Sequence, residues 1–235
     1  MIKAVIFDLD GTIVKFNIDF RSVRAEVRSF LITQGIPASV LSLNEGLFEM
    51  LKKTEIFLKN NGRMEREIEW LRGKALAIAE KFELEAAKTT SLLPGVTETL
   101  KTLKDMGLKM GICTVNSEKS VNYILKRFGI GEFFDAVTSR DKVKNVKPNV
   151  EHLKTTLKAL KVTAKEALVV GDSVADIKCA KELKILAVGL TTGVSTEKEL
   201  ISAEANYLIN SIADLPALIE KYQRPNSLEN FEIQA

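Results

Sequence analysis

Residues 3–12 of the chain read KAVIFDLDGT, an apolar and partly β-branched run that stops at two acidic residues and a glycine. A short run of this kind, without alternating polar side chains, is typical of a strand that is buried on both faces of a parallel sheet. We therefore predict a buried parallel strand at the start of the chain, ending near Asp8 and Asp10.

Beyond Pro94, strand-like and helix-like patterns alternate along the chain. This alternation predicts a parallel sheet that helices cover on both faces. The fold class is thus expected to be α/β, a doubly wound parallel sheet with a Rossmann-like core. The later strands are expected at 109–113, 136–138, 167–170, 185–188 and 205–209. The helices between them are expected at 96–106, 119–128, 149–160 and 174–183.

A helical segment interrupts this pattern between the first two strands. From residue 20 to residue 87, apolar residues recur at spacings of three and four, as in amphipathic helices. Breakers at 35–37 and 60–62 divide the segment into three or more helices. We interpret it as an inserted α-helical cap. The expected parts are a core of residues 1–15 and 91–222, a cap of residues 16–90, and a polar C-terminal tail of residues 223–235.

The composition excludes several classes of protein. Hydrophobic residues make up 46% and charged residues 28% of the 235 residues, which is typical of globular chains and not of disordered or fibrous ones. The net charge of +3 is too small to indicate a nucleic-acid or membrane surface. No apolar stretch fits a membrane span or a signal peptide, so a cytoplasmic location is expected. Cys113 and Cys179 stand alone and support neither a disulfide framework nor a zinc site.

Chemically reactive side chains follow the expected strands. In open α/β sheets, ligands bind beyond the carboxyl ends of the strands, so these positions are the ones to search for a site. They hold Asp8, Asp10 and Thr12 after the first strand, Thr114 and Asn116 after the second, Lys147 before a helix, and Asp172 and Asp176 after the strand at 167–170. Four carboxylic acids and one ammonium group are therefore expected at one edge of the sheet.

These residues resemble the four ordered motifs of the haloacid dehalogenase-like hydrolase superfamily. The motifs are DLDGT at 8–12, Thr114, Lys147-Pro148 and GDSVAD at 171–176. The helical insertion is similar to the small α-helical cap of phosphoglycolate-phosphatase-like and β-phosphoglucomutase-like members. Only 33 residues (147 − 114) separate Thr114 from Lys147, too few for the larger cap that other members carry there.

The two acids of the first motif suit a covalent mechanism. The Asp8 carboxylate can attack phosphorus, which splits hydrolysis into formation and breakdown of an aspartyl phosphate. Asp10 lies two residues further along an extended segment, so its side chain is expected on the same face. There it is suited to protonate the leaving oxygen and later to deprotonate water.

Other residues are expected to hold a cofactor and the phosphoryl group. Mg²⁺ prefers oxygen ligands and would offset the repulsion between Asp8 and a dianionic phosphate. The expected metal ligands are Asp8, Asp172, Asp176 and, as the resemblance implies, the backbone carbonyl of Asp10. The residues expected to bind phosphate are Thr114, Asn116 and Lys147.

Simpler roles remain open for several of these residues. Ser173 and Asp176 have the spacing of a capping box, in which both side chains only satisfy helix N-terminal amides. Asn116 stands two residues after Thr114, whereas family members often carry Asn directly after the Thr, so an ordinary loop role is equally open. His152, the only histidine, is expected to face solvent from its helix.

Specificity is expected to reside in the cap. Arg21, Arg24 and Arg28 have the spacing of one helix face, which would receive an acidic substrate group or remain a solvated basic face. Phe16 and Phe20 lie near the first linker and would line an entrance or pack in a core. The candidates for substrate specificity are Phe16, Phe20, Arg21 and Arg24.

The leading hypothesis is a Mg²⁺-dependent, phosphoglycolate-phosphatase-like enzyme acting on a small phosphomonoester. A phosphosugar mutase is the alternative, since it differs only in whether phosphate goes to water or back to a sugar. A phospho-accepting signalling module and a catalytically silent binding protein are less well supported, because the acid set is complete and a helical segment follows the first strand. The expected partner is a small phosphorylated metabolite, with no nucleic acid and no membrane, and the chain is expected to be a monomer or a homodimer.

Overall fold

The structure, a computed structural model, describes residues 1–223 of the chain. It divides into two compact units. The first, which we call the core, joins Met1–Phe16 to the segment that starts at Thr90, and the second, which we call the cap, is Asn17–Thr89. The expected C-terminal tail, residues 223–235, lies outside the described residues except for its first position.

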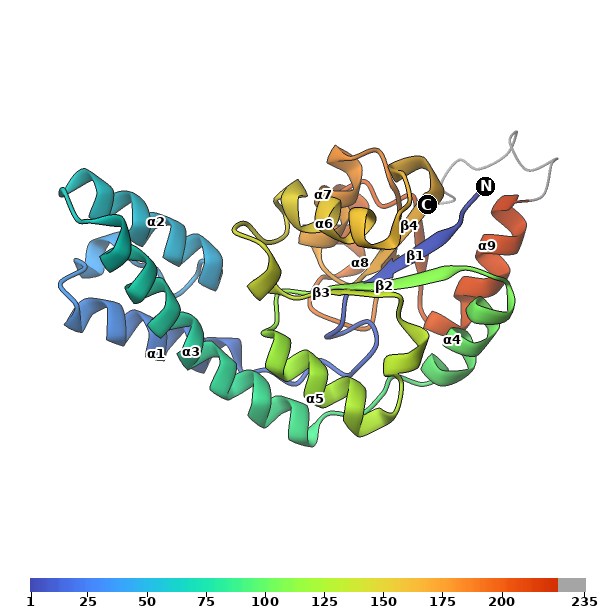
Figure 1. Cartoon of the computed structure of the whole chain (residues 1–235), viewed down its shortest axis with the longest axis horizontal. Helices are drawn as coiled ribbons and strands as arrows, with labels where there is room; N and C mark the ends of the chain where they lie inside the picture. Colours follow the sequence, from blue (N-terminus) through green and yellow to red (C-terminus); the bar gives the residue numbers. More distant parts are fainter. Residues whose placement is uncertain (224–235) are drawn as a thin grey trace. The chain divides into compact units, whose positions relative to one another are not determined.

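Within the described residues, the core contains one six-stranded sheet (Figure 1). Its strands are β1 (Ala4–Phe7), β2 (Lys109–Cys113), β3 (Ala136–Thr138), β4 (Ala167–Gly171), β5 (Leu186–Leu190) and β6 (Tyr207–Ile209). The order across the sheet is β3-β2-β1-β4-β5-β6, and all neighbouring pairs are parallel. The direction of winding changes between β1 and β4, which is where such sheets form a ligand-binding crevice.

Strand β1 lies in the middle of the sheet, and all four of its residues are buried. Its last residue, Phe7, is in register with Ile112 of β2 and with Val170 of β4. The backbone N–H of Asp8 continues this pairing by donating to the carbonyl of Val170 at 3.0 Å. The loops after β1, β2 and β4 therefore start at the same level of the sheet.

Helices cover both faces of the sheet (Figure 1). They are α4 (Val96–Asp105), α5 (Glu118–Phe128), α6 (Val150–Leu160), α7 (Val174–Glu182), α8 (Glu197–Ser202) and α9 (Leu215–Gln223). On one face, α6 packs on β2 and β3 and α7 packs on β4 and β5, whereas α4 packs on β2 and against α9. The expected doubly wound α/β fold is confirmed, with α8 and α9 as helices that the sequence patterns had not indicated.

The alternation of side chains along β1 explains how one strand serves both faces. Ala4 and Ile6 belong to the apolar cluster that also contains Leu153 of α6 and Ile177 of α7. Phe7 instead packs edge to face against Phe134, with ring centroids 6.4 Å apart. An apolar run without polar interruptions is what a strand needs when both faces are covered.

The cap consists, over its fully described residues, of the α-helices α1 (Phe20–Thr33), α2 (Leu47–Asn60) and α3 (Glu65–Thr89). Asp19 caps the first of them by accepting the backbone N–H of Ser22. The apolar stripes of the three helices form a hydrophobic cluster that includes Val27, Met50 and Ala75. The expected helical insertion after the first strand is thus confirmed.

Among the described residues, no helix combines the length and the apolar content that crossing a membrane requires.

Candidate active site

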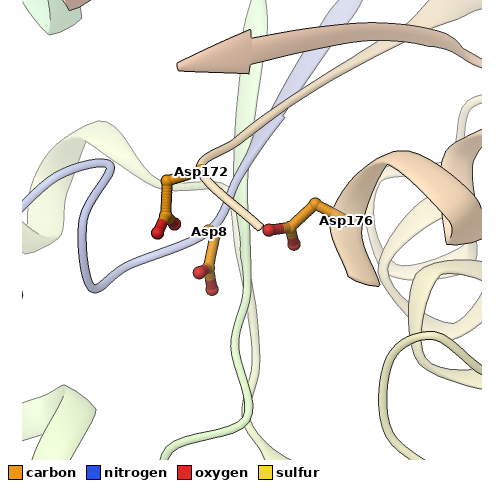
Figure 2. Close-up of side chains that lie close together, drawn as sticks. All are labelled: Asp8, Asp172 and Asp176. Atoms are coloured by element: carbon orange, nitrogen blue, oxygen red, sulfur yellow. The ribbon is translucent and has the colours of Figure 1, made fainter. Parts of the chain in front are cut away.

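Three carboxylates meet beyond the carboxyl ends of β1 and β4 (Figure 2). Asp8 directly follows β1, Asp172 directly follows β4, and Asp176 lies in the first turn of α7. Each offers an oxygen atom that lies within 4.8 Å of the oxygens from the other two. Because these segments are far apart in the sequence, the parallel pairing of β1 with β4 is what brings the acids together.

Asp172 is only 1% exposed and forms no ion pair among the described residues. Its carboxylate accepts from the Thr12 hydroxyl at 3.3 Å and from the backbone N–H of Val194 at 2.8 Å. Burial raises the pKa of Asp172 to about 8, and the neighbouring charges of Asp8 and Asp176 act in the same direction. The site therefore holds a buried acid whose charge no side chain offsets.

Two glycines let the chain close around Asp172. A Cβ atom on Gly193 would lie 1.8 Å from Oδ2 of Asp172, and one on Gly11 would lie 2.5 Å from the same oxygen. Gly11 also has a φ of +78°, a conformation that costs glycine little. Gly193 was not identified as a site residue from the sequence, because its role depends on the approach of a loop that follows a different strand.

The ammonium group of Lys147 lies between the other two acids. Its Nζ donates to Oδ1 of Asp8 at 2.9 Å, to Oδ1 of Asp176 at 2.5 Å and to the carbonyl of Cys113 at 2.6 Å. Burial alone would lower the pKa of Lys147, but the charges of Asp176 and Asp8 raise it well above its ordinary value. Lys147 is therefore a fixed, buried positive charge beside Asp8.

The carboxyl group of Asp8 is shaped by opposing effects. Burial raises its pKa to about 6, the charge of Lys147 lowers it, and the charge of Asp176 raises it. Its side chain is 13% exposed, more than that of Asp176 at 1%. Asp8 is thus the acid of this pair that retains access to a ligand.

Asp176 does form the capping box that its spacing indicates. Its Oδ2 accepts from the backbone N–H of Ser173 at 3.2 Å and from the Ser173 hydroxyl at 2.6 Å, while Ser173 accepts the backbone N–H of Asp176. The same carboxylate reaches Lys147 through Oδ1. The helix-capping role and membership of the acid cluster therefore occur together.

Asp10, Thr114 and Asn116 lie close together in the loops after β1 and β2. The Asn116 amide donates to Oδ2 of Asp10 at 2.5 Å, and the Asn116 backbone N–H donates to the Thr114 hydroxyl at 3.3 Å. Thr114 is held in turn by its own backbone N–H, which donates to the carbonyl of Thr138. Thr114 and Asn116 are 1% and 2% exposed, so they belong to the interior of the site.

The expectation that His152 faces solvent is wrong. The residue is fully buried, because α6 turns this face toward β3. Its Nε2 donates to the carbonyl of Thr138 at 3.1 Å, and its Nδ1 accepts the backbone N–H of Lys147 at 3.3 Å. Burial lowers the pKa of His152 to about 4. Because Thr156, four residues later, is also buried, the two side chains lie on the same inward face of α6.

The candidate specificity residues fall in both units. Phe16 belongs to the core, whereas Phe20, Arg21 and Arg24 belong to the cap. The Arg24 guanidinium donates to backbone carbonyls of the cap itself, those of Phe20 and Leu43, both at 3.1 Å. Arg28 likewise donates to carbonyls of the segment before α2, and Phe20 packs against the apolar cluster of the cap. Arg24 and Arg28 thus have structural roles in the cap.

The donor set of the acid cluster fits a hard divalent cation. All the ligand atoms are carboxylate oxygens, which Mg²⁺ prefers. A buried carboxylate is costly without a positive partner, and Lys147 offsets Asp8 and Asp176 but not Asp172. A cation held by Asp8 and Asp172 would supply the missing charge.

The chain has relatives that match most of its length. The family model of the haloacid dehalogenase-like hydrolases matches residues 5–190. Pyrophosphatase PpaX of Halalkalibacterium halodurans is 28% identical over 91% of this chain and 95% of its own. A phosphoglycolate phosphatase of Pseudomonas syringae pv. tomato is 29% identical over 98% of this chain and 88% of its own. The crystal structure of a hydrolase from Pseudomonas syringae superposes with a TM-score of 0.67, at 25% identity, over 93% of this chain and 98% of that one.

Proposed function

Because the chain belongs to the haloacid dehalogenase-like hydrolase family, we propose that it is a Mg²⁺-dependent phosphatase that hydrolyses a small phosphomonoester through an aspartyl phosphate on Asp8. The observation that carries this proposal is the meeting of Asp8 with Asp172 and Lys147 at the carboxyl edge of the sheet. This arrangement combines a partly accessible carboxylate with charges that can hold a phosphate next to it.

Asp8 is the proposed nucleophile. An oxygen of its carboxylate bonds to phosphorus while the bond from phosphorus to the leaving oxygen breaks. Lys147 and Thr114 bind the transferred phosphoryl group, since the lysine contacts Asp8 and Thr114 opens the adjacent loop. When bound to Asp8 and Asp172, with the Asp10 carbonyl as a further expected ligand, Mg²⁺ would offset the negative charge of the phosphate.

Asp10 is the proposed acid and base. It gives its proton to the leaving oxygen in the first step, so that an alcohol departs and the aspartyl phosphate remains. In the second step it takes a proton from water while the water oxygen bonds to phosphorus. The bond between Asp8 and phosphorus then breaks, which releases inorganic phosphate and restores both carboxyl groups.

The names of the relatives suggest two substrates to test first, phosphoglycolate and pyrophosphate. Both are small anionic phosphates, which agrees with the partner we propose, a small phosphorylated metabolite. A phosphosugar mutase remains the alternative on this scaffold. It would transfer phosphate from a hexose 1-phosphate to a hexose 6-position, with no inorganic phosphate formed.

The decisive experiment measures phosphate release from 4-nitrophenyl phosphate, phosphoglycolate and pyrophosphate. Each is tested with Mg²⁺, with EDTA, and with the variant Asp8→Asn, and Asp105→Asn at an exposed position of α4 is the matched control. We expect release that requires Mg²⁺, is lost in Asp8→Asn and is unchanged in Asp105→Asn. Release that persists in Asp8→Asn would refute the proposal, and conversion of glucose 1-phosphate to glucose 6-phosphate without release would favour the mutase.

A further inference from the structure

We propose that Asn116 is a positioning residue for Asp10 and not a ligand of the phosphate. The proposal rests on the phosphatase function, because it assigns a task within the same site. It differs from the phosphate-binding role expected for Asn116, and it follows from the hydrogen bond that the Asn116 side chain donates to Asp10.

The contact joins two loops that are 106 residues apart in the sequence, and its length is 2.5 Å between Nδ2 of Asn116 and Oδ2 of Asp10. The Asn116 amide donates through Nδ2, so Oδ2 of Asp10 is the acceptor in this contact. An amide oriented in this way directs its donor to the proposed proton-transfer group.

Backbone contacts hold Asn116 in this orientation. Its carbonyl accepts the backbone N–H of Arg140 at 3.1 Å, and its own N–H donates to the Thr114 hydroxyl. The Arg140 side chain, 3% exposed, donates from its guanidinium to the carbonyl of Val115 at 3.1 Å. The loop after β2 is therefore attached, at Val115 and Asn116, to Arg140 in the segment that follows β3.

The hydrogen bond has a chemical consequence for Asp10. A donor at Oδ2 makes that oxygen an acceptor, so the proton that Asp10 transfers belongs on Oδ1. Without the amide, this donor no longer distinguishes the two oxygens of Asp10, and the proton is less often aimed at the leaving group. A correctly placed general acid contributes about 10²–10⁴ in rate, so partial loss of its orientation is measurable.

The test uses two esters of similar shape that differ in their need for a proton. Phenyl phosphate has a poor leaving group that must be protonated, whereas 4-nitrophenolate departs without a proton. We expect Asn116→Ala to lower kcat/KM for phenyl phosphate by about 10- to 100-fold and that for 4-nitrophenyl phosphate by less than about 3-fold. Asn116→Asp keeps the shape of the side chain and replaces the amide donor by a carboxylate. It should also lower kcat/KM more for phenyl phosphate than for 4-nitrophenyl phosphate.

Several controls keep the result interpretable. Asn122→Ala, at an exposed asparagine of α5, should leave both values unchanged. The ratio of the two kcat/KM values does not depend on the fraction of folded enzyme, so a poorly folding variant still gives an answer. Asp10→Asn should show the same preferential loss on phenyl phosphate.

Equal losses on both esters would identify Asn116 as a phosphate ligand and overturn the proposal. No loss on either ester would overturn it as well. Failure of the phosphatase function is recognised separately, because wild-type enzyme would then release no phosphate from any ester, or Asp8→Asn would remain active.

Discussion

The Nδ1 atom of His152 accepts the backbone N–H of Lys147 at 3.3 Å, and this contact ties α6 to the residue that lies between Asp8 and Asp176. Because Nδ1 accepts this N–H while Nε2 donates to a carbonyl, the ring must be neutral, with its proton on Nε2. A second proton on Nδ1 would face the Lys147 N–H and break the contact. The position of Lys147 is therefore coupled to the charge of a residue outside the acid cluster.

This coupling predicts how stability depends on pH. The pKa of His152 is about 4 in the folded protein and about 6.5 in the unfolded chain. Between these two pH values, the unfolded chain binds a proton that the folded chain does not. The contribution of His152 to the free energy of unfolding is therefore complete above about pH 6.5 and is lost as the pH falls toward 4, by about 3 kcal/mol at most.

Urea unfolding of wild type and His152→Asn between these pH values provides the measurement. The difference between the two proteins should shrink on acidification, because carboxyl groups common to both cancel. Since His152 is the only histidine, no other imidazole contributes. A difference that stays constant with pH would contradict the neutral buried state.

Asp172 should be a source of instability when no cation is bound. In Asp172→Asn the amide oxygen can accept from Val194, and the Thr12 hydroxyl can turn to accept from the amide nitrogen, so the contacts survive without the charge. We expect the free energy of unfolding in EDTA to be higher for the variant than for wild type, by on the order of 1 kcal/mol or more. The variant should therefore unfold at a higher temperature.

Mg²⁺ should reverse this order, because ligand binding stabilises only the protein that binds it. Thermal unfolding with and without Mg²⁺ checks both parts, with Asp105→Asn as the control that should follow wild type. An equal shift by Mg²⁺ in wild type and Asp172→Asn would show that Asp172 does not hold the cation.

The ion pair between Lys147 and Asp176 should be strongly coupled. Removing one partner of a buried pair costs about 3–5 kcal/mol, so Lys147→Met should be destabilised by that order in EDTA. The double variant Lys147→Met/Asp176→Asn should be more stable than Lys147→Met alone, since it no longer buries the unpaired charge of Asp176. Urea unfolding of wild type, Lys147→Met, Asp176→Asn and the double variant gives the coupling energy, and simple additivity would contradict the pairing.

Two glycines should respond to alanine with opposite signs. Gly193→Ala would place a methyl group against Asp172 and should lower phosphate release and Mg²⁺ binding, at a cost of about 1–3 kcal/mol in stability. Gly73 lies within α3 with no atom within 4 Å of an added Cβ, so Gly73→Ala should stabilise the protein by up to about 1 kcal/mol. Activity assays and thermal unfolding test the pair, and normal activity in Gly193→Ala would contradict the tight approach.

The central part of the fold could be predicted from the sequence because buried parallel strands leave a clear pattern. The run at residues 4–7 has no polar interruption, and β2, with the same kind of pattern, was expected at the residues where it occurs. The gathering of Asp8 and Asp172 followed from the common level of the strand ends. Helix α8 escaped prediction because six residues are too few to show a helical period.

Contacts within the site were harder to predict, since they depend on which way each side chain turns. His152 was misjudged from its charged neighbours, although its spacing from Thr156 and Leu160 agreed with a buried face. The hydrogen bond from Asn116 to Asp10 connects two loops that lie close together because β1 pairs with β2. This hydrogen bond could not be predicted from the residue types or from their spacing in the sequence.

The most direct test of the covalent mechanism is chemical trapping on Asp8. The wild-type enzyme is mixed with Mg²⁺ and 4-nitrophenyl phosphate, quenched with borohydride and digested, and the N-terminal peptide is sequenced by mass spectrometry. An acyl phosphate is reduced to an alcohol, so we predict homoserine at position 8, aspartate at position 10, and no reduction when the ester is omitted. Steady phosphate release with an unmodified Asp8, or homoserine at another aspartate, would contradict the mechanism.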